Sequence, residues 1–104
     1  MRIVFDQGAP VPLRRHLSGY AVSTAFELGW ATLTNGDLLA AAEGKFDPLL
    51  TTDQNLRYQQ NLGNRKLAIL VLPTTSWPEI QKHIRQITDA ISLMKPGGYD
   101  EVRW

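Results

Sequence analysis

The segment from Lys66 to Leu72 constrains the fold more than any other part of this 104-residue sequence. Its centre, LAILV at 67–71, consists entirely of apolar residues. A strand with one face in water alternates apolar and polar side chains, whereas an unbroken apolar strand is typical of a sheet covered on both faces. The segment therefore predicts an internal strand with other elements packed above and below it.

Other apolar segments bounded by turn residues extend this pattern along the chain. Strands are expected at 2–6, 20–24, 48–52 and 99–104, and helical segments at 12–17, 25–28, 35–43, 54–62 and 76–94. Because strands and helices alternate, we expect mainly parallel strand pairing. The predicted fold class is α/β, a three-layer sandwich with a mainly parallel central sheet of four to five strands and helices on both faces.

Two of the expected helices carry clear start signals. Asn35 is a suitable N-cap for the helix that Gly44 ends. Ser76 and Glu79 have the spacing of a capping box. Behind that box, apolar residues recur at steps of four and three, at Ile80, Ile84, Ile87, Ile91 and Met94. This stripe predicts a core-facing helix, and its heptad-like step also fits a dimer seam.

Composition restricts the function classes. One domain spanning 1–104 is expected from the length. The absence of cysteine excludes disulfides, zinc-thiolate sites and a thiol nucleophile. With a net charge of +1, the chain has no general attraction to nucleic acid, so such binding would need local clustering of charge. No apolar stretch predicts a membrane span or a signal peptide, and we expect a cytoplasmic protein.

Four acidic residues stand where the chain enters or leaves the expected sheet. Asp6 closes the first strand and Asp53 closes the third, while Glu27 follows the second strand and Asp37 opens the next helix. Because ligands bind at the carboxyl ends of parallel strands, we expect the four carboxylates to converge. Such an all-oxygen set suits Mg²⁺ or Mn²⁺. Taken singly, each acid also fits an ordinary role as a turn, cap or surface residue.

Four sequence stretches together resemble the short PIN-like domains often found beside toxin–antitoxin genes. They are IVFDQGAPVPLRRHL (3–17), TAFELGW (24–30), NGDLLAAA (35–42) and LLTTDQNL (49–56). The resemblance covers residues 2 to 72. It implies a metal-dependent ribonuclease that uses Mg²⁺ or Mn²⁺, acts as the toxin of a type II toxin–antitoxin system and is restrained by a cognate antitoxin protein. It also implies a homodimer.

Carried over by position, the resemblance implies that Asp6, Glu27, Asp37 and Asp53 are the catalytic, metal-binding acids. By residue type, Thr51 and Thr52 could each bind a neighbouring carboxylate or a metal-bound water, or only close the strand, and Thr52 and Asn55 are the residues selected as supporting the acids. Relatives of this type often have an acid where this chain has Asn55. That departure keeps open a second hypothesis, a catalytically weak or inactive domain that binds RNA or protein.

Three arginines lie near the acids in sequence and are candidates for binding RNA phosphates, namely Arg14, Arg15 and Arg57. Each also fits a solvated helix position. A third functional hypothesis is a signalling receiver, because Asp53 ends the third strand, Thr74 follows the fourth, and Lys95 precedes a proline. Receivers normally have two acids after the first strand, and here Asp6 is followed by Gln7.

Overall fold

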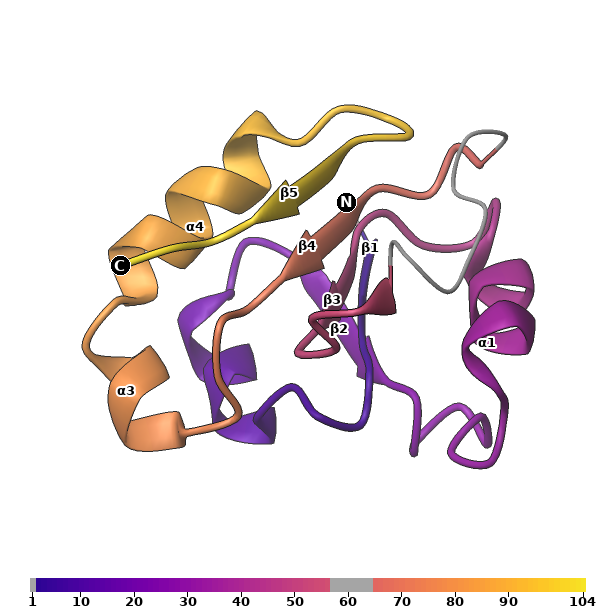
Figure 1. The fold of residues 1–104 in the computed structure, drawn as a ribbon, viewed down its shortest axis with the longest axis horizontal. Coiled ribbons are helices and arrows are strands. Elements are labelled where there is room, and N and C mark those ends of the chain that lie inside the picture. The colour runs from indigo at the N-terminus through magenta and orange to yellow at the C-terminus, as the bar shows by residue number, and fades with distance from the viewer. Residues whose placement is uncertain (1, 57–64) are drawn as a thin grey trace.

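A five-stranded parallel sheet forms the centre of the molecule in the computed structural model, which describes residues 2–56 and 65–104 (Figure 1). The strands are β1 (Arg2–Phe5), β2 (Ala21–Thr24), β3 (Leu49–Thr51), β4 (Ile69–Val71) and β5 (Tyr99–Glu101). Their order is β2-β1-β3-β4-β5, and each neighbouring pair is parallel. The predicted α/β fold is confirmed, and the sheet is wholly parallel.

Helical segments cover both faces of this sheet. The short 3-10 helix η1 (Val11–His16) lies on the same side as α3 (Trp77–Gln81) and α4 (Ile84–Leu93), while α1 (Asn35–Ala42) lies on the other side (Figure 1). The helix expected at 54–62 falls mostly outside the described residues. The three-layer arrangement follows from these positions.

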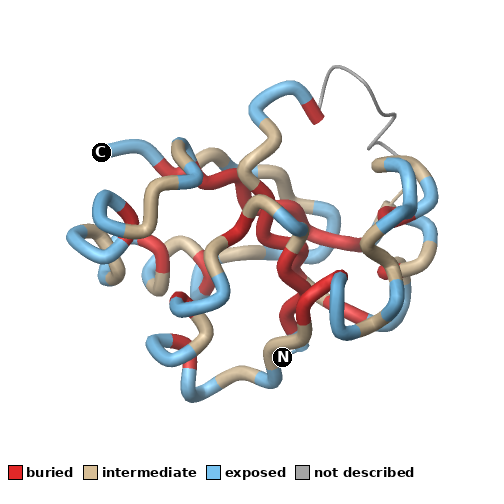
Figure 2. The backbone as a smooth tube through the Cα atoms, turned by 90° about the horizontal axis from the view of Figure 1, so that it is seen from below, coloured by how far each residue is buried: buried red, intermediate tan, exposed pale blue. Residues whose placement is uncertain are grey.

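Strand side chains alternate between two apolar cores, as the pleat of a strand requires. Ile3 and Phe5 pack with η1 and α4, whereas Val4 packs with α1. In β4, Leu70 faces the first core and Ile69 the second. The residues of the central strands are buried, as Figure 2 shows along the middle of the tube, and the two cores cover both of their faces. This two-sided burial explains the unbroken apolar run at 67–71.

The crossovers in the sheet do not all have the same hand. The connections β1–η1–β2 and β4–α3–α4–β5 run in opposite directions across the sheet, yet η1 and α3–α4 cover the same face. Two such crossovers must have opposite hands, while parallel crossovers are right-handed in about 98% of cases. The hand does not affect which edge the strand ends share, because that depends only on the strands being parallel.

Two helix boundaries differ from the sequence-based expectation. Thr34, not Asn35, is the N-cap of α1, and its hydroxyl accepts a hydrogen bond from the backbone of Asp37. The helix expected through 76–94 is divided at His83, whose φ of −125° and ψ of 27° are not helical. Ser76 caps α3 as predicted.

The isoleucine stripe is part of the core of a single chain. Ile80 from α3 and Ile87 and Ile91 from α4 are fully buried in one cluster with η1 and the sheet. Burying a side chain of this size contributes about 1.5–3 kcal/mol. The core interpretation of the stripe is confirmed. Within 2–56 and 65–104, no helix has the length and apolar character needed to cross a membrane.

Candidate functional site

Asp6 and Asp53 lie together at the carboxyl edge of the sheet, where they are linked through the hydroxyl of Thr51. Thr51 Oγ1 donates to Asp6 Oδ2 at 2.8 Å and accepts the backbone N–H of Asp53 at 3.1 Å. Thr51 is fully buried at the end of β3, and β3 pairs directly with β1. The pairing of these strands therefore brings together two acids that are far apart in sequence.

Both carboxylates are held by hydrogen bonds from neighbouring groups. Asp6 Oδ1 accepts the backbone N–H of Gln7 at 2.7 Å. Asp53 Oδ1 accepts the backbone N–H of Asn55 at 2.9 Å, and its Oδ2 accepts the side-chain amide of Asn35 at 2.9 Å. A carboxylate has about four acceptor positions. Each of these acids therefore keeps capacity for a further ligand.

Glu27 is engaged by Arg14 and by its own turn. The Arg14 guanidinium donates to both carboxylate oxygens, at 2.6 and 3.2 Å, and the backbone of Thr24 donates to Oε1 at 3.0 Å. The backbone N–H of Glu27 in turn donates to the Thr24 hydroxyl. The hydrogen bond from Arg14, followed by that from Thr24, lowers the pKa of Glu27. Glu27 is therefore ionised and paired at neutral pH.

Asp37 occupies an exposed position in the first turn of α1. A carboxylate there is favourable beside the positive end of the helix dipole. All four predicted acids belong to the described part of the chain, and within that part no three acidic, histidine or cysteine side chains are grouped closely enough to hold a metal ion. The structure brings Asp6 and Asp53 to one edge and does not assemble the four acids into one cluster.

The two acids are nevertheless compatible with a hard divalent cation. Mg²⁺ in proteins is often bound by only one or two carboxylates, with water and substrate phosphate completing its coordination. Asp6 and Asp53 supply oxygen donors of this kind, and Thr51 holds the carboxylate of Asp6 and the backbone of Asp53 at the end of β3. The donor set fits a magnesium or manganese ion shared with a substrate better than an ion enclosed by protein.

A surface groove of about 590 Å³ opens beside Asp6. Its lining includes Asp6, Gln7, Val11, Arg14, Phe26 and Glu27. Phe26 is 78% exposed and Val11 is 56% exposed, which is unusual for large apolar side chains. The groove therefore combines an acid, a paired arginine and an apolar wall.

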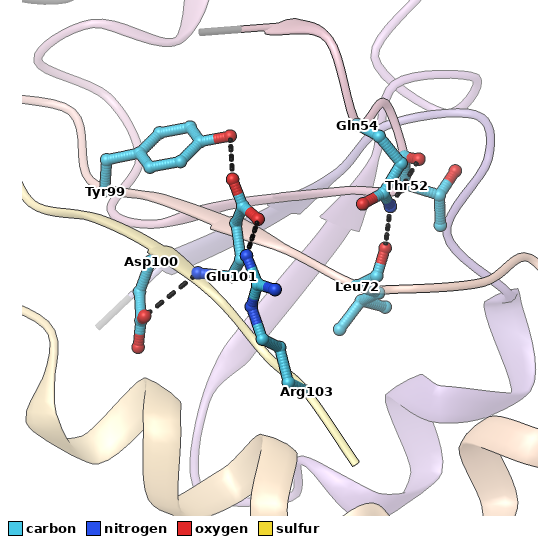
Figure 3. Close-up of polar contacts among 7 residues, drawn as sticks. All are labelled: Thr52, Gln54, Leu72, Tyr99, Asp100, Glu101 and Arg103. Atoms are coloured by element: carbon cyan, nitrogen blue, oxygen red, sulfur yellow. Dashed lines mark hydrogen bonds and ion pairs between the residues drawn. The ribbon is translucent and has the colours of Figure 1, made fainter.

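The adjacent threonines have different roles. Thr51, not Thr52, supports the acids, because the Thr52 hydroxyl packs against Gly8, where an added Cβ would lie 2.0 Å from that oxygen. The carbonyl of Thr52 accepts the side-chain amide of Gln54, which also donates to the carbonyl of Leu72 at 2.6 Å (Figure 3). Gln54 thereby ties the end of β3 to the end of β4.

The remaining predicted residues are placed as follows. The predicted supporting residue Asn55 contributes its backbone N–H to Asp53, while the residue itself is exposed. Arg14 lines the groove and Arg15 is exposed on η1. Arg57 lies outside the described residues. The Arg14 Nε atom is buried without a hydrogen-bond partner in the described structure.

Sequence reasoning missed three contributions near the carboxyl edge. Asn35, expected as a helix cap, binds Asp53, and Gln54 bridges two strand ends. Glu101 ends β5, where Tyr99 and Arg103 both donate to its carboxylate, at 3.3 and 2.9 Å (Figure 3). The only available signal was position, because each of these residues lies at or near the end of a strand or the start of a helix.

Comparison of the chain with protein-family models, with curated proteins and with solved structures finds no significant match.

Proposed function

We propose that the chain is a metal-dependent ribonuclease of the PIN-like type, with Mg²⁺ or Mn²⁺ held at the carboxyl edge by Asp6 and Asp53. The observation that carries the proposal is the connection of these two acids through Thr51. Convergence of acids at this edge is what the sequence resemblance requires. Wholly parallel strands also place ligand sites at this edge in other α/β proteins.

The proposed roles divide between the acids and the groove. Asp6 and Asp53 would hold the cation, which when bound would activate a water molecule and neutralise charge on the phosphodiester. Arg14 would bind a phosphate oxygen from the groove wall, since a guanidinium suits bidentate phosphate contacts. Glu27 would position Arg14 through their two hydrogen bonds. Cleavage would leave 5′-phosphate and 3′-hydroxyl ends, as the resemblance implies.

The biological setting follows from the same resemblance. The protein would act in the cytoplasm as the toxin of a type II toxin–antitoxin pair, as a homodimer, and a cognate antitoxin would block it. The exposed Phe26 and Val11 beside Asp6 give such an inhibitor an apolar surface close to the proposed metal site.

A second function, a binding domain without catalysis, is favoured by one group of observations. The negative charge of Glu27 is balanced by its ion pair with Arg14, and Asp37 is exposed on α1. Asn55 stands where relatives often have an acid. The receiver hypothesis has less support. Lys95 precedes β5 and therefore lies at the edge of the sheet opposite Asp53, so these two residues do not form a receiver-type site.

Cleavage of RNA by purified protein tests the proposal. Structured and single-stranded RNAs are incubated with Mg²⁺ or Mn²⁺ and with wild type, Asp6→Asn, Asp53→Asn or the surface control Asp89→Asn. We expect wild type and the control to cleave and both site variants to lose at least about 100-fold, equivalent to about 2.7 kcal/mol of transition-state stabilisation. Equal background cleavage by all four proteins would establish the binding-domain alternative instead.

A further inference from the structure

A second pocket, of about 480 Å³, opens at the amino edge of the sheet, opposite Asp6 and Asp53. We name it the amino-edge pocket, and its lining residues are Arg2, Gly44, Lys45, Phe46, Asp47, Lys66 and Pro96. Arg2 begins β1, and the other lining residues precede β3, β4 or β5. The pocket therefore lies where parallel strands begin, away from the proposed catalytic edge.

The acids around this pocket are already used to hold the backbone. Glu43 accepts the backbone N–H groups of Lys66 and Leu67, at 2.7 and 3.0 Å. Asp47 accepts the backbone N–H of Ala68 at 2.9 Å. These amides lead into β4 and have no strand partner at that point, so the two carboxylates are needed as caps.

The three basic side chains of the pocket are consequently left without acidic partners. Across 2–56 and 65–104, no ion pair involves Arg2, Lys45 or Lys66. With the Asp47 carboxylate included, the lining has three positive charges and one negative charge, and Glu43 beside Lys66 adds a second negative charge, so a positive excess remains. Local charge of this kind attracts anions even in a chain whose net charge is only +1.

The backbone and one aromatic ring fix the position of the pocket. The guanidinium carbon of Arg2 lies 4.7 Å from the ring centroid of Phe46, which is 6% exposed. The Arg2 carbonyl accepts the N–H of Asp47, and the Lys66 carbonyl accepts the N–H of Gly97, both at 2.7 Å. A guanidinium stacked on a ring keeps its N–H groups at the edge available for an oxyanion.

The arrangement of the cations indicates the shape of the anion. Arg2 is the first residue of β1, whereas Lys45 and Lys66 lie in the loops that lead into β3 and β4, and these three strands are successive neighbours in the sheet. The three cations therefore come from three separate segments that line one pocket. Several separate cations match consecutive phosphates of a polyanion better than one small ion.

We propose that the amino-edge pocket binds backbone phosphates of a single-stranded polynucleotide. Arg2 would make the bidentate contact, and Lys45 and Lys66 would neutralise neighbouring phosphates. The pocket would hold nucleic acid at the opposite edge of the sheet from Asp6. The proposal requires no cleavage and does not depend on metal at the carboxyl edge.

Binding of a fluorescein-labelled 12-nucleotide RNA, measured by polarisation in EDTA, tests this proposal without any cleavage. We expect the Lys45→Ala/Lys66→Ala variant to bind at least 10-fold more weakly than wild type. Its salt dependence should be shallower by about 1.4 in the slope of log K against log salt concentration, because two phosphate contacts are lost. Because EDTA removes the divalent metal, no metal-dependent cleavage takes place in this assay, which separates this test from the catalytic one.

The matched control removes the same charge elsewhere. Lys82 and Arg85 are exposed near the start of α4, and the Lys82→Ala/Arg85→Ala variant should retain nearly wild-type affinity. Equal weakening of both double variants would overturn the proposal, because the effect would then be one of net charge. Thermal unfolding of each variant verifies folding.

Two competitors distinguish the source of the phosphate and the class of polyanion. Unlabelled RNA should displace the probe at micromolar concentration, whereas inorganic phosphate should need a concentration at least 100-fold higher. Displacement by phosphate at the same concentration as RNA would show a site for a small anion and overturn the polynucleotide assignment. Equal displacement by polyglutamate of matched charge would overturn it in favour of an acidic peptide.

Discussion

The two edges of the sheet use acidic residues in different ways. At the amino edge, Glu43 and Asp47 bind backbone N–H groups that lead into the buried strand β4. At the carboxyl edge, Asp6 and Asp53 bind a threonine hydroxyl, an asparagine amide and the N–H groups of turns. The first pair completes the hydrogen bonding of the fold, whereas the second pair remains able to accept a ligand.

This difference predicts which acids contribute mainly to folding stability and which contribute mainly to ligand binding. Glu43 and Asp47 accept the N–H groups of the buried residues Leu67 and Ala68, and an N–H left unsatisfied there costs about 1–3 kcal/mol. The backbone N–H groups that Asp6 and Asp53 accept, from Gln7 and Asn55, belong to exposed turns, where water can replace the carboxylate. We therefore expect changes at the amino-edge acids to reduce stability, and changes at Asp6 or Asp53 to affect ligand chemistry.

The largest expected effect is on folding, from Glu43→Ala. Loss of the carboxylate leaves the part-buried N–H group of Leu67 without its acceptor, while water can replace it at the exposed N–H group of Lys66, and we expect a decrease of about 2–3 kcal/mol in the free energy of unfolding. Urea denaturation followed by circular dichroism measures it. Asp89→Ala on the exposed side of α4 is the control and should change stability by less than about 0.5 kcal/mol. If Glu43→Ala and Asp89→Ala changed stability equally, the amino-edge acids would have no special role in folding.

Gly8→Ala should have the next largest effect. The new Cβ would meet the Thr52 hydroxyl at 2.0 Å, so the Thr52 side chain or the loop after β1 must shift, at an expected cost of about 2 kcal/mol. Thr52→Ala removes that oxygen, and the Gly8→Ala/Thr52→Ala double variant should recover at least half of the loss. If urea denaturation showed that the stability effects of the two substitutions are simply additive, the contact between Gly8 and Thr52 would not be the cause of the loss.

Thr51→Val tests the link between the two carboxyl-edge acids. Valine keeps the shape of the buried side chain and removes the hydroxyl that binds Asp6 and the backbone of Asp53. We expect a loss of about 1.5 kcal/mol of stability. The rate of metal-dependent cleavage should fall by more than the decrease in the fraction of folded protein explains. Thr51→Ser retains the hydroxyl, and its cleavage rate should stay close to that of wild type; if valine and serine gave the same rate, the hydroxyl would have no role in aligning the acids.

The smallest expected effect is a titration shift at Glu27. Arg14→Ala removes the hydrogen bond that most lowers the pKa of Glu27, so that pKa should rise towards its ordinary value. In wild type the pKa is lower in the folded state, so this pairing favours folding above the ordinary pKa and is lost as the pH falls through the lowered value. Carbon-detected NMR titration of the Glu27 carboxyl gives the shift, and Arg15→Ala should leave it unchanged.

The architecture, and the position of Asp6 and Asp53 at one edge of the sheet, were predictable from sequence. The apolar run at 67–71 indicates a strand covered on both sides, and alternation of strands with helices indicates parallel pairing. Parallel strands place every strand end at one edge. From these regularities alone, two acids that follow strands are expected at the same edge, and Asp6 and Asp53 both contact Thr51 there.

Other features depend on tertiary contacts that carry no sequence signal. Which of two adjacent threonines contacts Asp6 depends on the pleat of β3, and sequence reasoning selected Thr52 instead of Thr51. The pairing of Arg14 with Glu27 depends on how η1 lies on the sheet. The break at His83 interrupts a regular apolar period, and the ring of His83 stacks on Trp104 with centroids 4.3 Å apart.

The dual contact of Thr51 makes the register of β3 decisive for the whole carboxyl edge. Side chains of a strand alternate between faces, so a slip of one residue would turn the Thr51 hydroxyl to the opposite side of the sheet. Asp6 would lose its partner and Asp53 its anchor in the same event. Any insertion or deletion between Phe46 and Thr51 that altered this alignment would remove both contacts together, one to the Asp6 carboxylate and one to the Asp53 backbone.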